Sequence, residues 1–81
     1  MARITVPMPK VGELTEQGTV IEWLVQEGQP AAALDPIVVM DTDKVEYEVE
    51  APASGTIVRV IAQLGEVVPI GGALCEMEVD G

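Results

Sequence analysis

The stretch Val45-Glu46-Tyr47-Glu48-Val49-Glu50 decides the fold, because apolar or aromatic residues occupy its odd positions and glutamate its even ones. In a β-strand, successive side chains point to opposite faces, so this pattern predicts one face in the core and three carboxylates in water. A helix would scatter the glutamates around its axis, and Ala51-Pro52 would end it. We therefore expect a half-buried strand with Val45, Tyr47 and Val49 inward.

Three further segments alternate in the same way, and each predicts a strand with one apolar face. The inward residues are Ile21, Trp23 and Val25 in the first segment, Val58, Val60 and Ala62 in the second, and Cys75, Met77 and Val79 in the third. Thirteen Val and six Ile also favour strands, because β-branched side chains fit a pleated surface. Glycines between the segments are typical of turns. The sequence therefore predicts an all-β sandwich or barrel.

The two halves of the chain resemble each other when one is shifted by 37 residues. In that register, six of 26 aligned positions (18–43 on 55–80) are identical: Gly, Thr, Gln, Gly, Met and Asp. Two such β-halves, neither able to bury a face alone, would pack together about a pseudo-two-fold axis. This symmetry predicts that Asp43-Lys44, at the end of the first half, and the end of the second half lie at opposite ends of the molecule.

Composition narrows the function classes. The chain has a formal net charge of −10, from four Lys and Arg against fourteen Asp and Glu, and its aromatics are one Trp and one Tyr. Nucleic-acid binding needs basic phosphate contacts and usually stacking aromatics, so we expect no nucleic-acid partner. A chain without His lacks the Ser-His and Cys-His catalytic pairs and most zinc sites. We therefore expect a non-catalytic domain without a metal site.

The single cysteine, Cys75, cannot form an internal disulfide, and its predicted inward position indicates a packed thiol rather than a nucleophile. No apolar run approaches the roughly 20 residues of a membrane span, and the first residues lack the apolar stretch of a signal peptide. These features predict no membrane partner and no targeting segment. The expected compartment is the cytoplasm of a bacterium, or the mitochondrial matrix if the chain is eukaryotic.

Lys44 has the most informative setting of the four cations. It stands in Asp41-Thr42-Asp43-Lys44-Val45-Glu46, between a strand that ends near Met40 and the alternating strand. A break of one or two residues predicts a hairpin with Lys44 at its tip, and the absence of Gly favours a type I turn over the primed types. Taken by itself, such a residue is usually a solvated turn lysine.

The surrounding sequence changes that interpretation, because several motifs in register resemble those of lipoyl domains. The matching stretches are Met8-Pro9-Lys10-Val11-Gly12-Glu13, Glu16-Gln17-Gly18-Thr19-Val20-Ile21-Glu22-Trp23-Leu24, Glu27-Gly28, Asp41-Thr42-Asp43-Lys44-Val45, Glu48-Val49-Glu50-Ala51-Pro52-Ala53-Ser54-Gly55, and Gly65-x-x-Val68 with Gly71. The resemblance runs from about Ile4 to Val79 and predicts a single lipoyl domain over residues 1–81. It is strongest to the N-terminal lipoyl domains of the acyltransferase component of 2-oxo acid dehydrogenase complexes.

Two turns depart from the family pattern. Members commonly carry Gly-Asp where this chain has Gly28-Gln29, and again where it has Leu34-Asp35. These differences put the geometry of the two turns in question, but not the lysine hairpin.

The resemblance implies a flattened β-barrel of two four-stranded antiparallel sheets with quasi-two-fold symmetry. It also implies that lipoic acid is amide-linked to Lys44, so that the domain shuttles acyl groups and reducing equivalents between active sites. The implied partners are a thiamine-diphosphate-dependent dehydrogenase component, an acyltransferase catalytic domain, dihydrolipoyl dehydrogenase and a lipoate-attaching enzyme. The domain would be the non-catalytic part of a dihydrolipoamide acyltransferase chain, and in isolation a monomer.

The family also suggests recognition residues near the lysine. Asp41 and Asp43 would be read by the lipoylating and partner enzymes, although both are also ordinary turn residues. Glu13 and Glu16, in the loop before the second strand, would help to select the partner dehydrogenase. Val45 follows the lysine, where biotinyl domains typically carry Met on both sides, and this flank favours lipoate.

Two alternatives to a lipoyl carrier remain open from the sequence. A biotinyl domain would share the fold and use the same lysine for carboxyl transfer. An unmodified β-domain that serves only as an interaction module would leave Lys44 as an ordinary surface residue.

Overall fold

The computed structural model of the chain describes residues 2–10, 16–43 and 45–79, and this part contains eight β-strands and no helix. The strands are β1 (Ala2–Pro7), β2 (Gln17–Trp23), β3 (Pro30–Ala31), β4 (Pro36–Asp41), β5 (Glu46–Glu50), β6 (Gly55–Val60), β7 (Val67–Pro69) and β8 (Ala73–Val79). Within the described ranges there is accordingly no helix long and apolar enough to cross a membrane.

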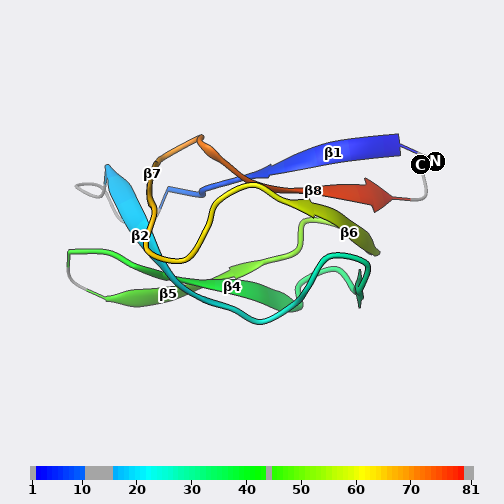
Figure 1. The fold of residues 1–81 in the computed structure, drawn as a ribbon, viewed down its shortest axis with the longest axis horizontal. Helices are drawn as coiled ribbons and strands as arrows, with labels where there is room; N and C mark the ends of the chain where they lie inside the picture. Colours follow the sequence, from blue (N-terminus) through cyan, green and yellow to red (C-terminus); the bar gives the residue numbers. More distant parts are fainter. Residues whose placement is uncertain (1, 11–15, 44, 80–81) are drawn as a thin grey trace.

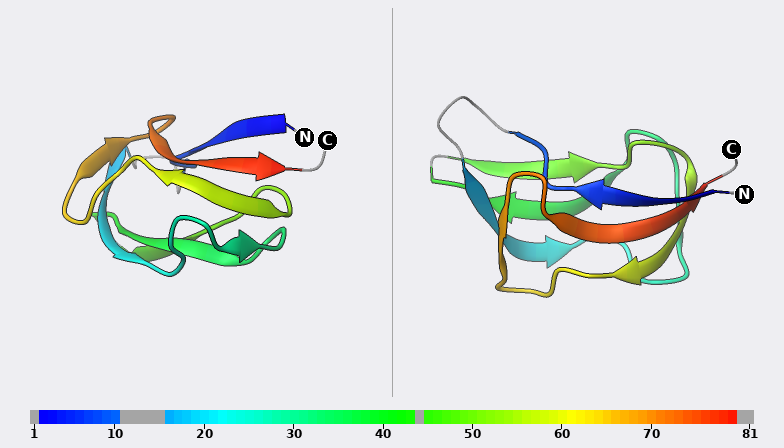
Figure 2. Two further views of the ribbon diagram at one scale, coloured as in Figure 1. Left: turned by 45° about the vertical axis from the view of Figure 1, so that its right-hand side comes forward. Right: turned by 90° about the horizontal axis from the view of Figure 1, so that it is seen from above.

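The strands form two four-stranded sheets that face each other as two layers (Figures 1 and 2). The strand order is β1-β8-β6-β3 in one sheet and β5-β4-β2-β7 in the other, and every pair of neighbours is antiparallel. The molecule is flattened, with extents of 36 × 22 × 17 Å. The predicted all-β fold of two four-stranded antiparallel sheets is confirmed.

The predicted internal symmetry is confirmed in detail. A shift of 37 residues carries β2 onto β6, β3 onto β7 and β4 onto β8, and β5 then corresponds to β1, so the two sheets have equivalent strand orders. The turns repeat as well: Gly65 N–H donates to the Val20 carbonyl at 2.8 Å, and Gly28 N–H donates to the Ile57 carbonyl at 2.6 Å. The two glycines have φ angles of 86° and 90°.

Two residues that were predicted to point inward, one in β2 and one in β6, do not do so, and the reason is the same in both strands. The register shifts between Val20 and Glu22 in β2, and between Ile57 and Arg59 in β6. Each shift is a β-bulge, which inserts one extra residue and changes the face on which the next side chains lie. Val20 and Ile57 are therefore buried, whereas Ile21 is 41% exposed and Val58 only half-buried.

The core lies between the two layers and consists almost entirely of aliphatic side chains and methionines. Its largest fully buried members are Met8, Ile37, Met40, Ile57, Leu74, Met77, Val6, Val20, Val38 and Cys75. The predicted inward faces of β8 and β5 are confirmed at Cys75, Met77 and Val79 and at Val49, while Tyr47 is half-buried against the core. Burial of this kind, at about 25 cal/mol per Å² of apolar surface, is what holds the sheets together.

The two ends of the molecule differ in what they carry. The start of β1 and the end of β8 lie together at one end, with Ala2 opposite Val79, and the ends of β4 and β5 that meet at the hairpin lie at the other (Figure 1). This separation is the one that the pseudo-two-fold symmetry predicts.

Candidate functional site

The β4–β5 hairpin is closed at its tip by Thr42 and Val45. Thr42 N–H donates to the Val45 carbonyl at 2.9 Å, and the Thr42 hydroxyl donates to the same oxygen at 2.7 Å. The Val45 N–H in turn donates to Thr42 Oγ1 at 3.3 Å. Because these two residues bond to each other, only Asp43 and Lys44 remain between them. The predicted hairpin is confirmed by the pairing of β4 with β5.

The function of Thr42 was not predicted. Its side chain is the one buried polar side chain of the described residues, and it satisfies its hydroxyl on the backbone across the turn. The signal that could have found it is the residue type, since Ser and Thr hydroxyls often hydrogen-bond to the backbone in turns. Thr42 thus ties the two sides of the turn together through its own side chain.

The hairpin is anchored in the middle of its sheet. β4 lies between β5 and β2, and its residues Ile37, Val38 and Met40 have no exposed surface. A strand that is paired on both sides and buried by its side chains opens only with much of the fold. The connection after β4 is consequently held on a stiff base.

Two predictions at the tip need correction or lie beyond the structure. Val45 was expected to point inward but is 54% exposed. It belongs to the turn, beyond the last core residue of β4, Met40, and only its backbone is used, by Thr42. Lys44 lies outside the described residues, and the type of the turn depends on it. Asp43 is not among the described residues with positive φ, as the primed turn types would require.

The carboxylates around the tip are exposed, and two of them are cross-strand neighbours. Asp41 is directly opposite Glu46 across the two strands, and Asp43 is exposed in the turn. Like charges that face each other across a strand pair are destabilising. The ion pairs between described residues, Arg3–Glu78 at 3.7 Å and Arg59–Glu76 at 3.9 Å, both lie on the other sheet.

The loop residues predicted to select a partner are only partly described. Glu16 is exposed, precedes β2, and accepts a hydrogen bond on its carbonyl from Ile70 N–H at 3.0 Å. Because β2 runs antiparallel to β4, with Thr19 opposite Asp41, the start of β2 lies at the hairpin end of the molecule (Figure 1). Glu13 lies outside the described residues.

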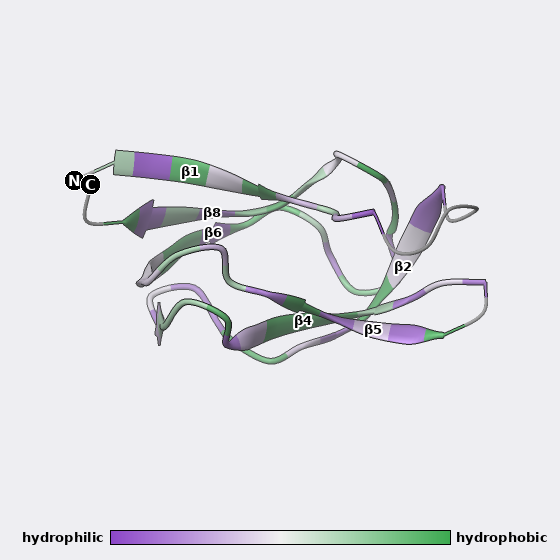
Figure 3. Ribbon diagram, turned by 180° about the vertical axis from the view of Figure 1, so that it is seen from behind, coloured by the Kyte–Doolittle hydropathy of each residue, from purple (hydrophilic) through white to green (hydrophobic). Residues whose placement is uncertain are grey.

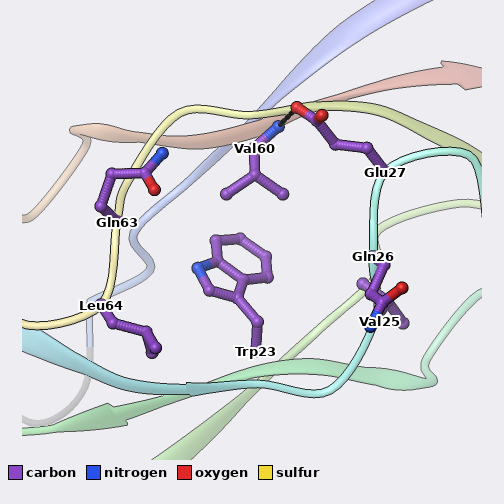
Figure 4. Close-up of a pocket in the computed structure, with 7 residues that line it drawn as sticks. All are labelled: Trp23, Val25, Gln26, Glu27, Val60, Gln63 and Leu64. Atoms are coloured by element: carbon purple, nitrogen blue, oxygen red, sulfur yellow. Dashed lines mark hydrogen bonds between the residues drawn. The ribbon is translucent and has the colours of Figure 1, made fainter.

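Neither of the two aromatic residues is at the tip, and each lines a cleft elsewhere. Trp23 forms the floor of an open cleft of about 500 Å³, together with Val60, Gln26, Gln63 and Leu64 (Figure 4). Its indole Nε1 donates to the Ala62 carbonyl at 2.9 Å, and the ring is half-buried against the core, as its predicted packing function requires. Trp23 and Val60 are equivalent under the 37-residue shift, as are Gln26 and Gln63, so this cleft straddles the pseudo-two-fold axis.

Cys75 is buried among core residues, and this burial raises the pKa of its thiol to about 11. A thiol with such a pKa is protonated at neutral pH and is a poor nucleophile. Among the described residues, no group of three or more His, Cys, Asp or Glu side chains is arranged to hold a metal ion.

A two-layer β-domain that presents a short turn from a central strand is typical of domains that carry a covalently attached group. Residues 4–77 match the family model described as "Biotin-requiring enzyme", whose name is Biotin_lipoyl. The chain belongs to this biotin and lipoyl family.

The curated relatives to which the chain is similar show which branch of the family it belongs to. The chain is 36% identical over 81 residues to the lipoamide acyltransferase component of the branched-chain alpha-keto acid dehydrogenase complex of Bacillus subtilis, covering 100% of the chain and 19% of the relative. It is 43% identical over 72 residues to the dihydrolipoyllysine-residue acetyltransferase component of the pyruvate dehydrogenase complex of Mycobacterium bovis, covering 89% and 13%. It thus spans about a fifth of these relatives or less.

Solved structures show the same architecture in both branches. The lipoyl domain of the 2-oxoglutarate dehydrogenase complex of Azotobacter vinelandii superposes with a TM-score of 0.75 at 32% identity, over 96% of this chain and 99% of that one. A long-chain acyl-CoA carboxylase gives a TM-score of 0.81 at 25% identity, over 98% of this chain and 7% of that one. Together with the acyltransferase relatives, these matches identify a lipoyl domain homologous to those of 2-oxo acid dehydrogenase complexes.

Proposed function

We propose that residues 1–81 form a single lipoyl domain in which lipoic acid is amide-linked to the ε-nitrogen of Lys44. The observation that carries the proposal is the closure of the hairpin by Thr42 and Val45, which leaves two residues at the tip. A modifying enzyme can then reach one lysine on a stiff base. When bound, lipoic acid supplies a dithiolane that accepts electrons and an acyl group, so the chemistry belongs to the cofactor.

The chain itself contributes presentation rather than catalysis. The central position of β4 holds the tip, and the Thr42 hydroxyl keeps the two sides of the turn together. Asp41, Asp43 and Val45 are exposed beside Lys44 and are the surface that a lipoate-attaching enzyme reads. Glu13 and Glu16 help to select the partner dehydrogenase. A tethered carrier raises the local concentration of its arm at each active site, which needs no catalytic residue in the carrier.

The names of the relatives support the partners. We assign the domain to a longer dihydrolipoamide acyltransferase chain, because it covers only 13–19% of the two acyltransferase components compared above. Its partners are then a thiamine-diphosphate-dependent dehydrogenase component, an acyltransferase catalytic domain and dihydrolipoyl dehydrogenase. The isolated domain is a monomer in this proposal. Both relatives are bacterial, which supports a cytoplasmic location.

The test is the intact mass of the chain after production with lipoate, biotin and both ligases, followed by peptide mapping. We expect one lipoyl group on Lys44 in the parent chain. Lys44→Arg keeps the charge and should abolish the modification completely. Lys10→Arg, the same change at the other lysine of the chain, should leave it unaffected.

The other outcomes of this experiment are equally informative. A lipoyl group on Lys10 would move the site. A biotinyl group on Lys44 would keep the carrier fold but replace acyl transfer by carboxyl transfer, as in the carboxylase that shares the fold. No addition to any variant would favour the unmodified interaction module.

A further inference from the structure

A second cleft, of about 230 Å³, lies between the edge strands of the two sheets. Pro7 and Pro9 from the segment of β1 form one side of it, and Tyr47 and Pro52 from the segment of β5 form the other, with Glu50 at the same side. The lining is mostly apolar, and the three prolines make its walls rigid. Along β5 the lining of the cleft runs from Tyr47 to Glu50, and it continues to Pro52.

The neighbouring strand β5 is an edge strand with free backbone groups. It is the outermost strand in the order β5-β4-β2-β7. Thr42 and Val45 are a hydrogen-bonded pair, so the alternation of an antiparallel ladder directs the backbone of Tyr47 toward β4 and that of Glu46 and Glu48 away from it. Among the described residues, no backbone hydrogen bond joins Glu46 or Glu48 to a further strand.

The same strand carries a row of acidic side chains. Glu46, Glu48 and Glu50 are exposed, and they alternate along β5 with less hydrophilic residues, as the colours of the ribbon in Figure 3 show. The ion pairs between described residues involve other glutamates, on β8. Of the described residues, Lys10 is an exposed cation that follows Pro9 on the opposite wall of the cleft, against three exposed glutamates on β5.

We propose that β5 binds an extended segment of a partner protein as an additional strand. The Lys or Arg residues of that segment lie opposite Glu46 and Glu48 on the outer face, and its alternate apolar side chains point to the other face, into the cleft beside Tyr47. Main-chain hydrogen bonds supply affinity in this mode of recognition, and alternate side chains supply specificity. Two copies of this chain cannot pair in the same way, because glutamates would face glutamates.

The alternation of basic and apolar residues in the partner segment is set by β5 and not by Lys44. The proposal therefore holds whether or not the lysine is lipoylated. The probe is a capped seven-residue peptide with Lys at its odd positions and Val or Leu at its even ones, titrated into the unlipoylated 81-residue chain. We expect amide hydrogen exchange at Glu46 and Glu48 to slow at least tenfold at saturation, because their N–H groups point away from β4 and gain a new acceptor. Exchange at Tyr47 should change little, since its N–H is already bonded to β4.

Variants separate strand addition from simple charge attraction. Glu46→Gln and Glu48→Gln should each weaken binding of the peptide about two- to fivefold, the effect of one cross-strand ion pair. Glu22→Gln removes the same charge from β2, an inner strand of the same sheet, and should leave the affinity unchanged. A shuffled peptide, with its lysines grouped at one end, should bind at least tenfold more weakly.

Two results would overturn the proposal. If Glu22→Gln weakens binding as much as Glu48→Gln, or if the shuffled peptide binds equally well, the interaction is only long-range attraction to an acidic domain. If the alternating peptide binds without protecting the amides of Glu46 and Glu48, it does not add to β5.

Discussion

The two ends of this molecule have nearly the same backbone but carry different charges. At the end where β1 begins and β8 ends, Arg3 of β1 pairs with Glu78 of β8, and their side chains form an ion pair of 3.7 Å. The equivalent position at the hairpin end pairs Glu46 of β5 with Asp41 of β4. The symmetry therefore places a salt bridge at one end and two like charges at the other.

The contrast extends over the two sheets. The strands β1, β8, β6 and β3 carry two Arg and two Glu, so their net charge is 2 − 2 = 0. The strands β5, β4, β2 and β7 carry Glu22, Asp41, Glu46, Glu48 and Glu50 and no cation, so theirs is −5. Since the neutral sheet has the same topology, the fold does not require this acidity. The charge on the second sheet is more readily explained by partners, whose basic surfaces it would attract.

The largest difference between the two halves should appear at a pair of identical glycines. A Cβ at Gly55 would overlap the carbonyl oxygen of Glu78 and lie 2.9 Å from Val79 Cγ1. A Cβ at the equivalent Gly18 would lie 3.0 and 3.4 Å from the methyl ends of Met8 and Met40, and at an ordinary contact distance of 3.5 Å from the carbonyl oxygen of Asp41. Gly55→Ala should therefore lower the free energy of unfolding by about 3 kcal/mol, and Gly18→Ala by less than about 1 kcal/mol.

Urea unfolding of both variants and the parent chain measures this difference. Equal losses of the free energy of unfolding in the two variants would mean that the methionine side chains at Gly18 cannot move aside. The packing around the two glycines would then be equally dense.

The second difference concerns Cys75, whose equivalent in the first half is Val38. Burial raises the pKa of this thiol from 9.0 to about 11, so between these values the unfolded chain has lost the proton and the folded chain has kept it. The stabilisation is complete below pH 9 and is lost as the pH rises toward 11, by about 2 to 3 kcal/mol in total.

Replacing the thiol by the side chain of its counterpart isolates this contribution. Urea unfolding at pH 8.5 and pH 11 gives the change in the free energy of unfolding between these pH values for the parent chain and for Cys75→Val. This free energy should fall by about 2 to 3 kcal/mol more in the parent than in the variant. Comparing each protein with itself removes the effect of the substitution on packing. A thiol that titrates near pH 9 in the folded chain would make the two changes equal.

The third difference is the backbone strain in one turn. Leu34 has a φ of 73° and is 70% exposed, and its equivalent in the second half is Gly71, with a φ of 84°. A left-handed conformation costs a residue with a Cβ about 1 to 2 kcal/mol in the folded state. Replacing that residue by glycine removes the strain, but it also increases the conformational entropy of the unfolded chain, which offsets part of the gain. Leu34→Gly should stabilise the domain by about 0.5 to 1 kcal/mol, and Gly71→Leu should destabilise it by about 1 kcal/mol.

Melting temperatures of the two variants check the signs. A loss in Leu34→Gly would show that the exposed leucine makes contacts worth more than the strain. The departure from Gly-Asp that the sequence shows at Leu34-Asp35 would then be compensated at that turn.

The sequence predicted the fold where strands are regular and failed where they are interrupted. Alternation located the faces of β8 and most of β5, because no bulge disturbs the inward residues Cys75, Met77 and Val79. It assigned Ile21 and Val58 to the wrong face, because a bulge inserts one residue and a period of two carries no sign of it. Both bulges lie at equivalent positions of the internal repeat, so the same error occurs in both halves.

The candidate site could be predicted in outline but not in its contacts. The short break after Met40 predicted the hairpin, since strand ends are readable from pattern. The hydrogen bonds of Thr42 depend on how the turn closes, and the clefts at Trp23 and Tyr47 depend on which strand edges meet. These are properties of the tertiary arrangement, and residue types alone do not contain them.

The smallest effect on stability tests the comparison most directly. Glu46→Arg would give the hairpin end the ion pair that Arg3 and Glu78 form at the other end, with Asp41 as the acidic partner. Because both side chains are exposed, the gain in the free energy of unfolding should be only a few tenths of a kcal/mol at low salt, and should disappear at 1 M salt.

If the acidic pair is retained for recognition, the same variant should be lipoylated more slowly by the lipoate-attaching enzyme despite its greater stability. Thr5→Arg, which places an arginine on β1 of the neutral sheet and raises the net charge by one where Glu46→Arg raises it by two, is the control and should be lipoylated at the parent rate. Slower modification of both variants would point to net charge alone. An unchanged rate in Glu46→Arg would mean that the like-charged pair is not read by that enzyme, and would leave the partner enzymes or the edge of β5 as the reason for its acidity.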